Sequence, residues 1–155
     1  MLELAQRQNG ICEGEKMQYI RVTTDNMVEL KMLQFGYKQE IGEDRPTDGD
    51  FDSLCDAISK GLILFFGCID AGKLIACCSI TPTYSTFNYQ MGGVFEDFYI
   101  VPEYRHKGIA RQLVEFAYRK SGVGSLTVGC ADCDVKMYQS LGFAVPLGNL
   151  LAFED

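Results

Sequence analysis

The chain has 155 residues, of which 47% are hydrophobic and 23% charged, and its formal net charge is −7 at pH 7. Such a composition is typical of a globular domain, and a chain of about 150 residues can bury a core without disulfide or metal staples. The negative charge argues against a nucleic-acid partner, because phosphate binding requires a basic surface.

Seven cysteines and one histidine limit the metal chemistry open to the chain. Cys68, Cys77 and Cys78 fall in apolar, strand-like runs, which indicates small core residues in a reducing compartment. Cys130 and Cys133 form a lone C-x-x-C, so we expect neither a zinc site nor a redox pair. No apolar run reaches the ~20 residues of a membrane span and no signal peptide is visible, so we expect no membrane partner and a cytoplasmic location.

The first half of the chain predicts a strand, two helices and a β-hairpin. Residues 1–16 have the composition of a polar leader, and Met17 is a second candidate for the natural start. We expect a single domain over 17–155. In chain order the elements are a strand at 17–24, a helix capped by Asp25 or Asn26, an acidic loop at 40–52, a helix at 51–61, and strands at 62–69 and 74–83.

The second half predicts a βαβ unit followed by a helix and a hairpin. Ile109, Leu113, Phe116 and Ala117 form one apolar stripe on its first helix. The elements are a connector at 84–93, a strand at 94–101 ended by Pro102, a helix from about Gly108 to Ser121, a strand at 125–130, a helix at 134–142 and a terminal hairpin at 143–153. This order predicts an α/β (α+β) fold, with a mixed, mostly antiparallel sheet and helices on both faces.

The junction between the strand at 94–101 and the following helix carries the clearest chemical signal. Gly108 has no Cβ, so a ligand could approach the backbone closely. The first N–H groups of a helix lack intrahelical partners, and Arg105 and Lys107 add positive charge. Such a junction can bind phosphate, although an ordinary solvated turn would show the same residues.

The longer pattern resembles the GNAT superfamily of N-acetyltransferases. Arg105-x-x-Gly108-x-Ala110 after an apolar strand is similar to the family's coenzyme A pyrophosphate loop. The sequence M-Y-Q-S-L-G-F at 137–143 resembles the second signature of the family. The resemblance implies acetyl-coenzyme A as co-substrate, no metal, and direct attack by an amine in a ternary complex.

The resemblance also implies roles for individual residues. Tyr138 would protonate the departing thiolate, which suits a phenol because its unperturbed pKa of about 10 lies above that of a thiol. Three strand residues would offer backbone groups to the pantetheine arm, and the following loop would wrap the pyrophosphate. The implied coenzyme A-binding residues are Phe98, Tyr99, Ile100, Arg105, His106, Lys107, Gly108, Ile109 and Ala110.

Glu96 is the candidate general base. A primary ammonium must lose a proton before it attacks a thioester, and a carboxylate on the strand beside the thioester could accept it. The sequence E-D-F-Y-I-V-P-E-Y-R at 96–105 resembles the polyamine (spermidine/spermine) acetyltransferase branch, in which a glutamate at this position is a proposed base. Glu96 could equally only line the pocket, and strand alternation predicts that Asp97 points to the opposite face.

Some positions depart from the family pattern. His106, the single histidine, stands where glycine is common, and we interpret it as a residue at the rim of the phosphate site. Ala131 replaces a frequent asparagine and Asp134 a frequent alanine, so the asparagine contact to coenzyme A is in doubt, although Asp132 lies close by.

The acceptor side is predicted from charge. The loop at 40–52 could attract a cationic amine, or it could simply be solvated. Tyr84, Phe87 and Tyr89 could bracket an amine or serve packing. The acidic residues of the loop, opposed by Arg45, are Glu40, Glu43, Asp44, Asp48, Asp50 and Asp52.

Three functions remain open. The leading one is an enzyme that acetylates a primary amine, with a small cationic amine as favoured substrate. The alternatives are an N-acetyltransferase acting on a protein or peptide, and a non-catalytic acyl-coenzyme A-binding module. Members of the family are often dimers, so a homodimer is one of the partners to test.

Overall fold

A computed structural model describes residues 17–154, and the predicted leader at 1–16 lies outside this range. The described chain forms a five-stranded sheet in the order β1-β2-β3-β4-β5, antiparallel except for the parallel pair β4 and β5. The predicted mixed, mostly antiparallel sheet is confirmed. The strands are β1 (Gln18–Val22), β2 (Leu64–Asp70), β3 (Lys73–Ser85), β4 (Gln90–Ile100) and β5 (Ser125–Val128).

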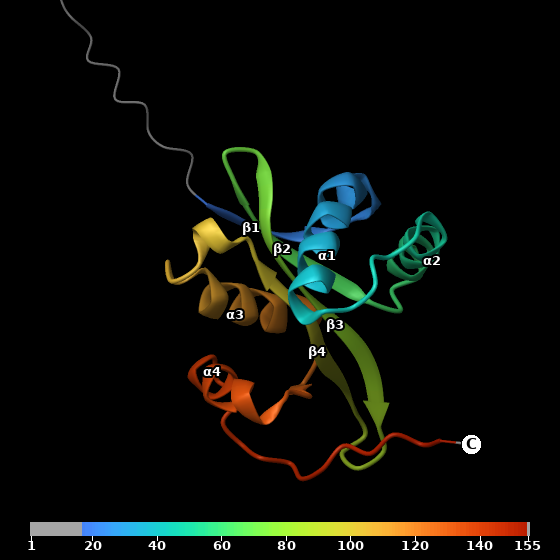
Figure 1. Ribbon diagram of the computed structural model, residues 1–155. Helices are drawn as coiled ribbons and strands as arrows, with labels where there is room; N and C mark the ends of the chain where they lie inside the picture. Colours follow the sequence, from blue (N-terminus) through green and yellow to red (C-terminus); the bar gives the residue numbers. More distant parts are fainter. Residues whose placement is uncertain (1–16, 155) are drawn as a thin grey trace, which may run out of the picture.

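Four α-helices within residues 17–154 cover the two faces of this sheet. Figure 1 shows α1 and α2 on one side and α3 and α4 on the other. Each side has its own apolar core, one built around Phe65 and Leu30 beneath α1, the other around Phe66, Phe95 and Leu113 beneath α3. The helices are α1 (Met27–Ile41), α2 (Asp48–Ser59), α3 (Ile109–Ser121) and α4 (Val135–Ser140).

Strands β3 and β4 are longer than predicted and take in most of the expected connector at 84–93. Tyr84 pairs with Met91 and Thr83 with Gly92. The Gly92–Gly93 pair suggests a turn, yet a Cβ on Gly93 would lie 2.5 Å from Ile80 Cγ2. Glycine is therefore needed here for close packing within the strand rather than for a bend.

The predicted terminal hairpin at 143–153 is wrong. Residues 143–154 contain no strand. Pro146 has no N–H to donate in the first of the two short arms, and an isolated two-stranded hairpin is marginal in water. The segment runs in red along the lower edge of Figure 1, from α4 to the C-terminus.

Candidate active site

A β-bulge at Asp97 divides β4 into two parts. The register of β3 against β4 shifts between Cys77 and Ser79, and Asp97 has φ of 51°, a left-handed conformation that aspartate tolerates better than most residues. As a result Phe95 and Phe98, three positions apart, pack into the same core with ring centroids 5.6 Å apart. Strict alternation would place them on opposite faces.

The bulge brings both acidic residues of β4 to the α1 side of the sheet. Glu96 is paired directly with Ser79, and directly opposed residues share a face. The Ser79 hydroxyl donates a hydrogen bond of 2.6 Å to Asp97 Oδ2. Cys77, two residues before Ser79 on β3, belongs to the core beneath α1. The prediction that Asp97 points away from Glu96 is therefore wrong, because alternation does not hold across a bulge.

The carboxylates of Glu96 and Asp97 differ in their contacts with the rest of the protein. Asp97 is half-buried, and its carbonyl oxygen also accepts a contact of 3.6 Å from the Cys77 thiol. Glu96 is exposed, and its carboxylate has no hydrogen bond or ion pair to any residue in 17–154. Asp97 is thus held by two contacts with β3, whereas the Glu96 carboxylate has no partner within residues 17–154.

Helix α1 contributes a phenol that the sequence did not single out. Gly36 lets α1 approach β4 closely, since a Cβ there would lie 2.5 Å from the Tyr99 hydroxyl. The next residue, Tyr37, is half-buried, and burial followed by the negative charges of Asp97 and Glu96 raises its pKa. Tyr37 therefore stays protonated beside the two carboxylates. A glycine inside a helical pattern was the signal that could have indicated this contact.

Tyr138 of α4 lies on the other side of β4. Its ring packs edge-on against Phe95 and Phe143, with centroids 6.5 and 5.8 Å away, and at 6.4 Å from Phe98. Burial raises its pKa to about 12, and the neighbouring Tyr37 phenol adds to this rise. Its hydroxyl accordingly remains a proton donor throughout the physiological pH range. The two phenols, from α1 and α4, flank the part of β4 that carries the carboxylates.

Strands β4 and β5 separate beyond Phe95. They pair only between Gly92–Phe95 and Ser125–Val128, so no strand among residues 17–154 lies on the β5 side of Glu96–Ile100. An edge left open in this way presents backbone donors and acceptors to an extended ligand. The predicted pantetheine-contacting residues, Phe98, Tyr99 and Ile100, all lie on this part of β4.

The junction between β4 and α3 presents unpaired backbone N–H groups. His106 and Gly108 have φ values of 60° and 79°, and alternating positive φ turns successive N–H groups toward one concave side. Among the described residues, nothing accepts a hydrogen bond from the N–H groups of His106, Lys107 or Gly108, and α3 has no side-chain cap. Ile109 and Ala110, in the first turn of α3, extend this run of free donors.

Arg105 acts differently from the rest of the loop. Its N–H donates to the Pro102 carbonyl at 3.2 Å, so the free N–H groups begin at His106. Its Nε donates to the Ile100 carbonyl at 2.9 Å, and its terminal nitrogen forms an ion pair with Glu40 of α1. Arg105 thereby ties the end of β4 to α1, and it engages one carbonyl of the open strand edge.

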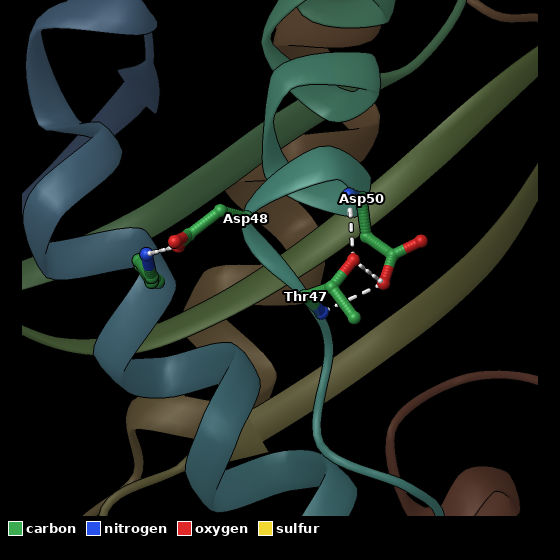
Figure 2. Close-up of polar contacts among 4 residues, drawn as sticks. Thr47, Asp48 and Asp50 are labelled. Atoms are coloured by element: carbon green, nitrogen blue, oxygen red, sulfur yellow. Dashed lines mark hydrogen bonds and ion pairs between the residues drawn. The ribbon is translucent and has the colours of Figure 1, made fainter.

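Several acidic residues of the 40–52 loop have structural partners, and α2 begins earlier than predicted. Figure 2 shows Thr47 and Asp50 closing a capping box at the start of α2, in which Asp50 Oδ2 accepts from the Thr47 N–H at 2.7 Å. The Asp48 carboxylate forms an ion pair of 2.5 Å with Lys31 of α1, and Figure 2 marks the contact of Asp48 with a dashed line. These contacts lower the pKa of both aspartates. Glu40 pairs with Arg105, and the remaining acids of the loop, Glu43, Asp44 and Asp52, have no charged or capping partner in the described chain.

The aromatic connector does not lie with the carboxylates. Tyr84, Phe87 and Tyr89 are exposed at the turn between β3 and β4. Tyr84 is five residues along β3 from Ser79, about 17 Å at the rise of an extended strand. The structure therefore does not bring these side chains to Glu96.

Three further observations concern a cavity, metal binding and membrane-spanning helices in the described chain. A cavity of about 430 Å³ lies between α1, the 44–47 loop and α2, lined by Gln34, Lys38, Arg45 and Phe51 among others. Within residues 17–154 no three His, Cys, Asp or Glu side chains gather into a group that could bind a metal ion. None of the described helices is long and apolar enough to cross a membrane.

Comparison with known proteins places this geometry in a family. Residues 62–145, more than half of the chain, match the sequence model described as "Acetyltransferase (GNAT) domain". No match is found among curated proteins.

Three solved structures illustrate the likeness in fold. An aminoglycoside acetyltransferase, meta-AAC0020, from an uncultured soil metagenomic sample in complex with sisomicin has a TM-score of 0.76 at 9% identity, covering 90% of this chain and 95% of that one. Glucosamine-6-phosphate N-acetyltransferase from Arabidopsis thaliana has a TM-score of 0.71 at 16% identity, covering 91% and 100%. A predicted acetyltransferase with acetyl-CoA from Clostridium acetobutylicum has a TM-score of 0.68 at 17% identity, covering 89% and 96%.

Proposed function

Because the chain belongs to the GNAT acetyltransferase family, we propose that it transfers acetyl from acetyl-coenzyme A to the primary amine of a small cationic molecule. The observation that carries this proposal is the open part of β4, where Glu96 and Asp97 lie on one face and Tyr138 on the other. We infer that residues 17–155 act as a single acetyltransferase domain. The buried free thiols of the strands favour the reducing cytoplasm as its compartment.

The residues present fit coenzyme A. The free N–H groups from His106 to Ala110 would bind its pyrophosphate, since the concave loop and the start of α3 both favour an anion. The open edge at Phe98, Tyr99 and Ile100 would bind the pantetheine arm as an added strand. Once bound, the co-substrate supplies an acetyl group already activated as a thioester.

The side chains around the bulge would move the protons. Glu96 would accept the proton that the acceptor ammonium must lose, directly or through water, because it alone of the two carboxylates is free of other partners. Asp97, held by Ser79, and the protonated Tyr37 would orient the amine beside it. As the C–N bond forms and the C–S bond breaks, the Tyr138 hydroxyl would donate to the departing sulfur.

The negative charge of Glu96 and Asp97 supports a cationic amine as the acetyl acceptor. An ammonium is attracted to the paired carboxylates of β4, and polyamines and aminoglycosides are the cationic classes to examine first. The solved relatives act on chemically different amines, among them aminoglycosides and glucosamine-6-phosphate. A protein or peptide amine remains the second candidate, because Glu96 is exposed at the surface.

A thiol-release assay with acetyl-coenzyme A tests this proposal. Polyamines, aminoglycosides, amino sugars and lysine peptides would be offered in parallel, and acetylated products identified by mass spectrometry. Turnover of a small polycationic amine supports the proposal, and turnover of peptides alone favours the second candidate. Binding of coenzyme A without turnover of any amine would instead indicate a non-catalytic binding module.

A further inference from the structure

The cavity between α1 and α2 lies on the face of α1 that is turned away from β4. Its volume of about 430 Å³ is in the range of small-molecule pockets. Gln34 and Lys38 line it from one face of α1, a single turn apart. Gly36 and Glu40, which contact the end of β4 and the loop after it, each lie two residues further on, about 200° around the helix. The cavity is therefore separate from the carboxylates of β4.

The side chain of Gln34 brings a buried donor without an acceptor to this cavity. The residue is only 6% exposed. Its Nε2 is the one buried side-chain nitrogen or oxygen in residues 17–154 that has no hydrogen-bond partner. A buried polar group left unpaired destabilises a fold, so such a group beside a cavity favours a ligand that supplies an acceptor.

Two cationic side chains of the cavity have no ion-pair partner in residues 17–154. Lys38 is half-buried, and Arg45 stacks on Phe35 with its guanidinium carbon 3.7 Å from the ring centroid. Stacking covers one face of the guanidinium and leaves its in-plane N–H groups free to bind. Together with the Gln34 amide, these cations present the donors that a carboxylate requires.

The cavity also offers a negative charge and an apolar surface. Asp50 lines it, but Figure 2 shows that its carboxylate already accepts hydrogen bonds from the N–H and the hydroxyl of Thr47. Asp44 lines it with no ion pair to the described chain. The buried Phe51 and the half-buried Leu54 add an apolar wall. Groups for an anion, a cation and an apolar side chain thus lie around one cavity.

We propose that this cavity binds a free α-amino acid with an apolar side chain. The carboxylate of the ligand is held by Lys38, Arg45 and the Gln34 amide, which gives the buried Nε2 the acceptor it lacks. The ammonium of the ligand pairs with Asp44, and its side chain packs on Phe51. The proposal is independent of acetyl transfer, because the ligand lies on the face of α1 turned away from β4.

Calorimetric titration of the full chain, without acetyl-coenzyme A, tests this with three matched probes. L-phenylalanine carries both charges, phenylpropionate only the carboxylate, and phenethylamine only the ammonium. We expect L-phenylalanine to bind at least about tenfold more tightly than either of the other two, because each of them lacks one paired charge. Equal binding of either probe, or no binding of L-phenylalanine at millimolar concentration, would overturn the proposal.

Variants on the two faces of α1 and beyond locate the bound amino acid. Lys38→Met and Arg45→Met should each weaken L-phenylalanine binding about tenfold or more. Arg119→Met removes an exposed cation from α3, on the other side of the sheet, and should bind like the wild type. Glu96→Gln should also bind normally. Binding that is lost in Glu96→Gln but kept in Lys38→Met would place the amino acid at β4 and overturn the proposal.

Gln34→Leu separates the effect on binding from an effect on folding. Removal of the unpaired amide should raise the melting temperature of the ligand-free protein, because leucine leaves no buried polar group unsatisfied. The same variant should bind L-phenylalanine about tenfold more weakly. A more stable variant with weaker binding supports the site, since a merely structural role would lower both. Wild-type affinity in this variant would overturn the proposed site, whatever its melting temperature.

Discussion

The Ser79 hydroxyl and Asp97 Oδ2 lie 2.6 Å apart, and this hydrogen bond joins β3 to the bulge of β4. The bulge places Asp97 beside Glu96 and leaves its φ at 51°. The conformation of this one residue therefore decides which face of the sheet carries the second carboxylate.

Substitutions at Asp97 test the bulge through stability. Asp97→Asn should unfold at nearly the wild-type urea concentration, because asparagine tolerates the left-handed region. Asp97→Val should be less stable by about 1–3 kcal/mol, the range for a strained residue of this kind. Equal stability of the valine variant would show that β4 continues without a bulge.

The roles of the two carboxylates separate in pH–rate profiles. Glu96→Gln cannot accept a proton, so kcat should fall most at neutral pH and recover partly at higher pH, where more of the amine is already neutral. Asp97→Asn should mainly raise KM for the amine, because Asp97 is already held by Ser79. Identical pH profiles for Glu96→Gln and wild type would remove Glu96 as the base.

Gly108 tests the pyrophosphate loop, with Gly122 as its control. Both glycines are exposed at the ends of α3, with φ of 79° and 75°, so alanine imposes similar backbone strain at each. Gly108→Ala should weaken coenzyme A binding about tenfold or more by calorimetry, because it disturbs the free N–H groups of the loop. Gly122→Ala should lose stability to a similar degree and bind normally. Equal affinities would show that the loop does not hold the pyrophosphate.

The capping box of α2 predicts an acid-dependent stability. Its contacts lower the pKa of Asp50 in the folded state, so their stabilisation is present above the unfolded pKa of about 3.9 and is lost as pH falls through the folded value. Asp50→Asn should lower the melting temperature by a few degrees at pH 7 and by less near pH 3. Asp52→Asn, which lies outside the capping box, should leave the melting temperature unchanged at both pH values. A melting-temperature loss that does not shrink toward pH 3 would contradict the ionised cap.

The sequence predicted the sheet and the strand–loop–helix junction around Gly108 because both depend on local patterns. The conformation of a short stretch of backbone is indicated by its own residues, here by apolar runs, helix caps and the Arg105-x-x-Gly108 spacing. The bulge at Asp97 was not predictable by alternation, since it arises where β3 and β4 must pack with different registers on either side of Cys78. Tyr37 was missed because its approach to Glu96 and Asp97 depends on how α1 packs on β4, and the neighbouring Gly36 was the one local sign of that packing.

Tyr138 packs against Phe98 of the open part of β4 and is the proposed proton donor to the departing thiolate. Its pKa of about 12 keeps the hydroxyl protonated, so its contribution should not change between pH 6 and about 10. Tyr118→Phe on α3 is a matched control, because its hydroxyl donates to the Gly124 carbonyl away from the carboxylates.

The most direct test is single-turnover acetyl transfer by the Tyr138→Phe variant to whichever amine proves to be a substrate. We expect the rate of the chemical step to fall about tenfold to a thousandfold, with acetyl-coenzyme A affinity little changed and Tyr118→Phe equal to wild type. A Tyr138→Phe variant that transfers acetyl at the wild-type rate would contradict the proposed site.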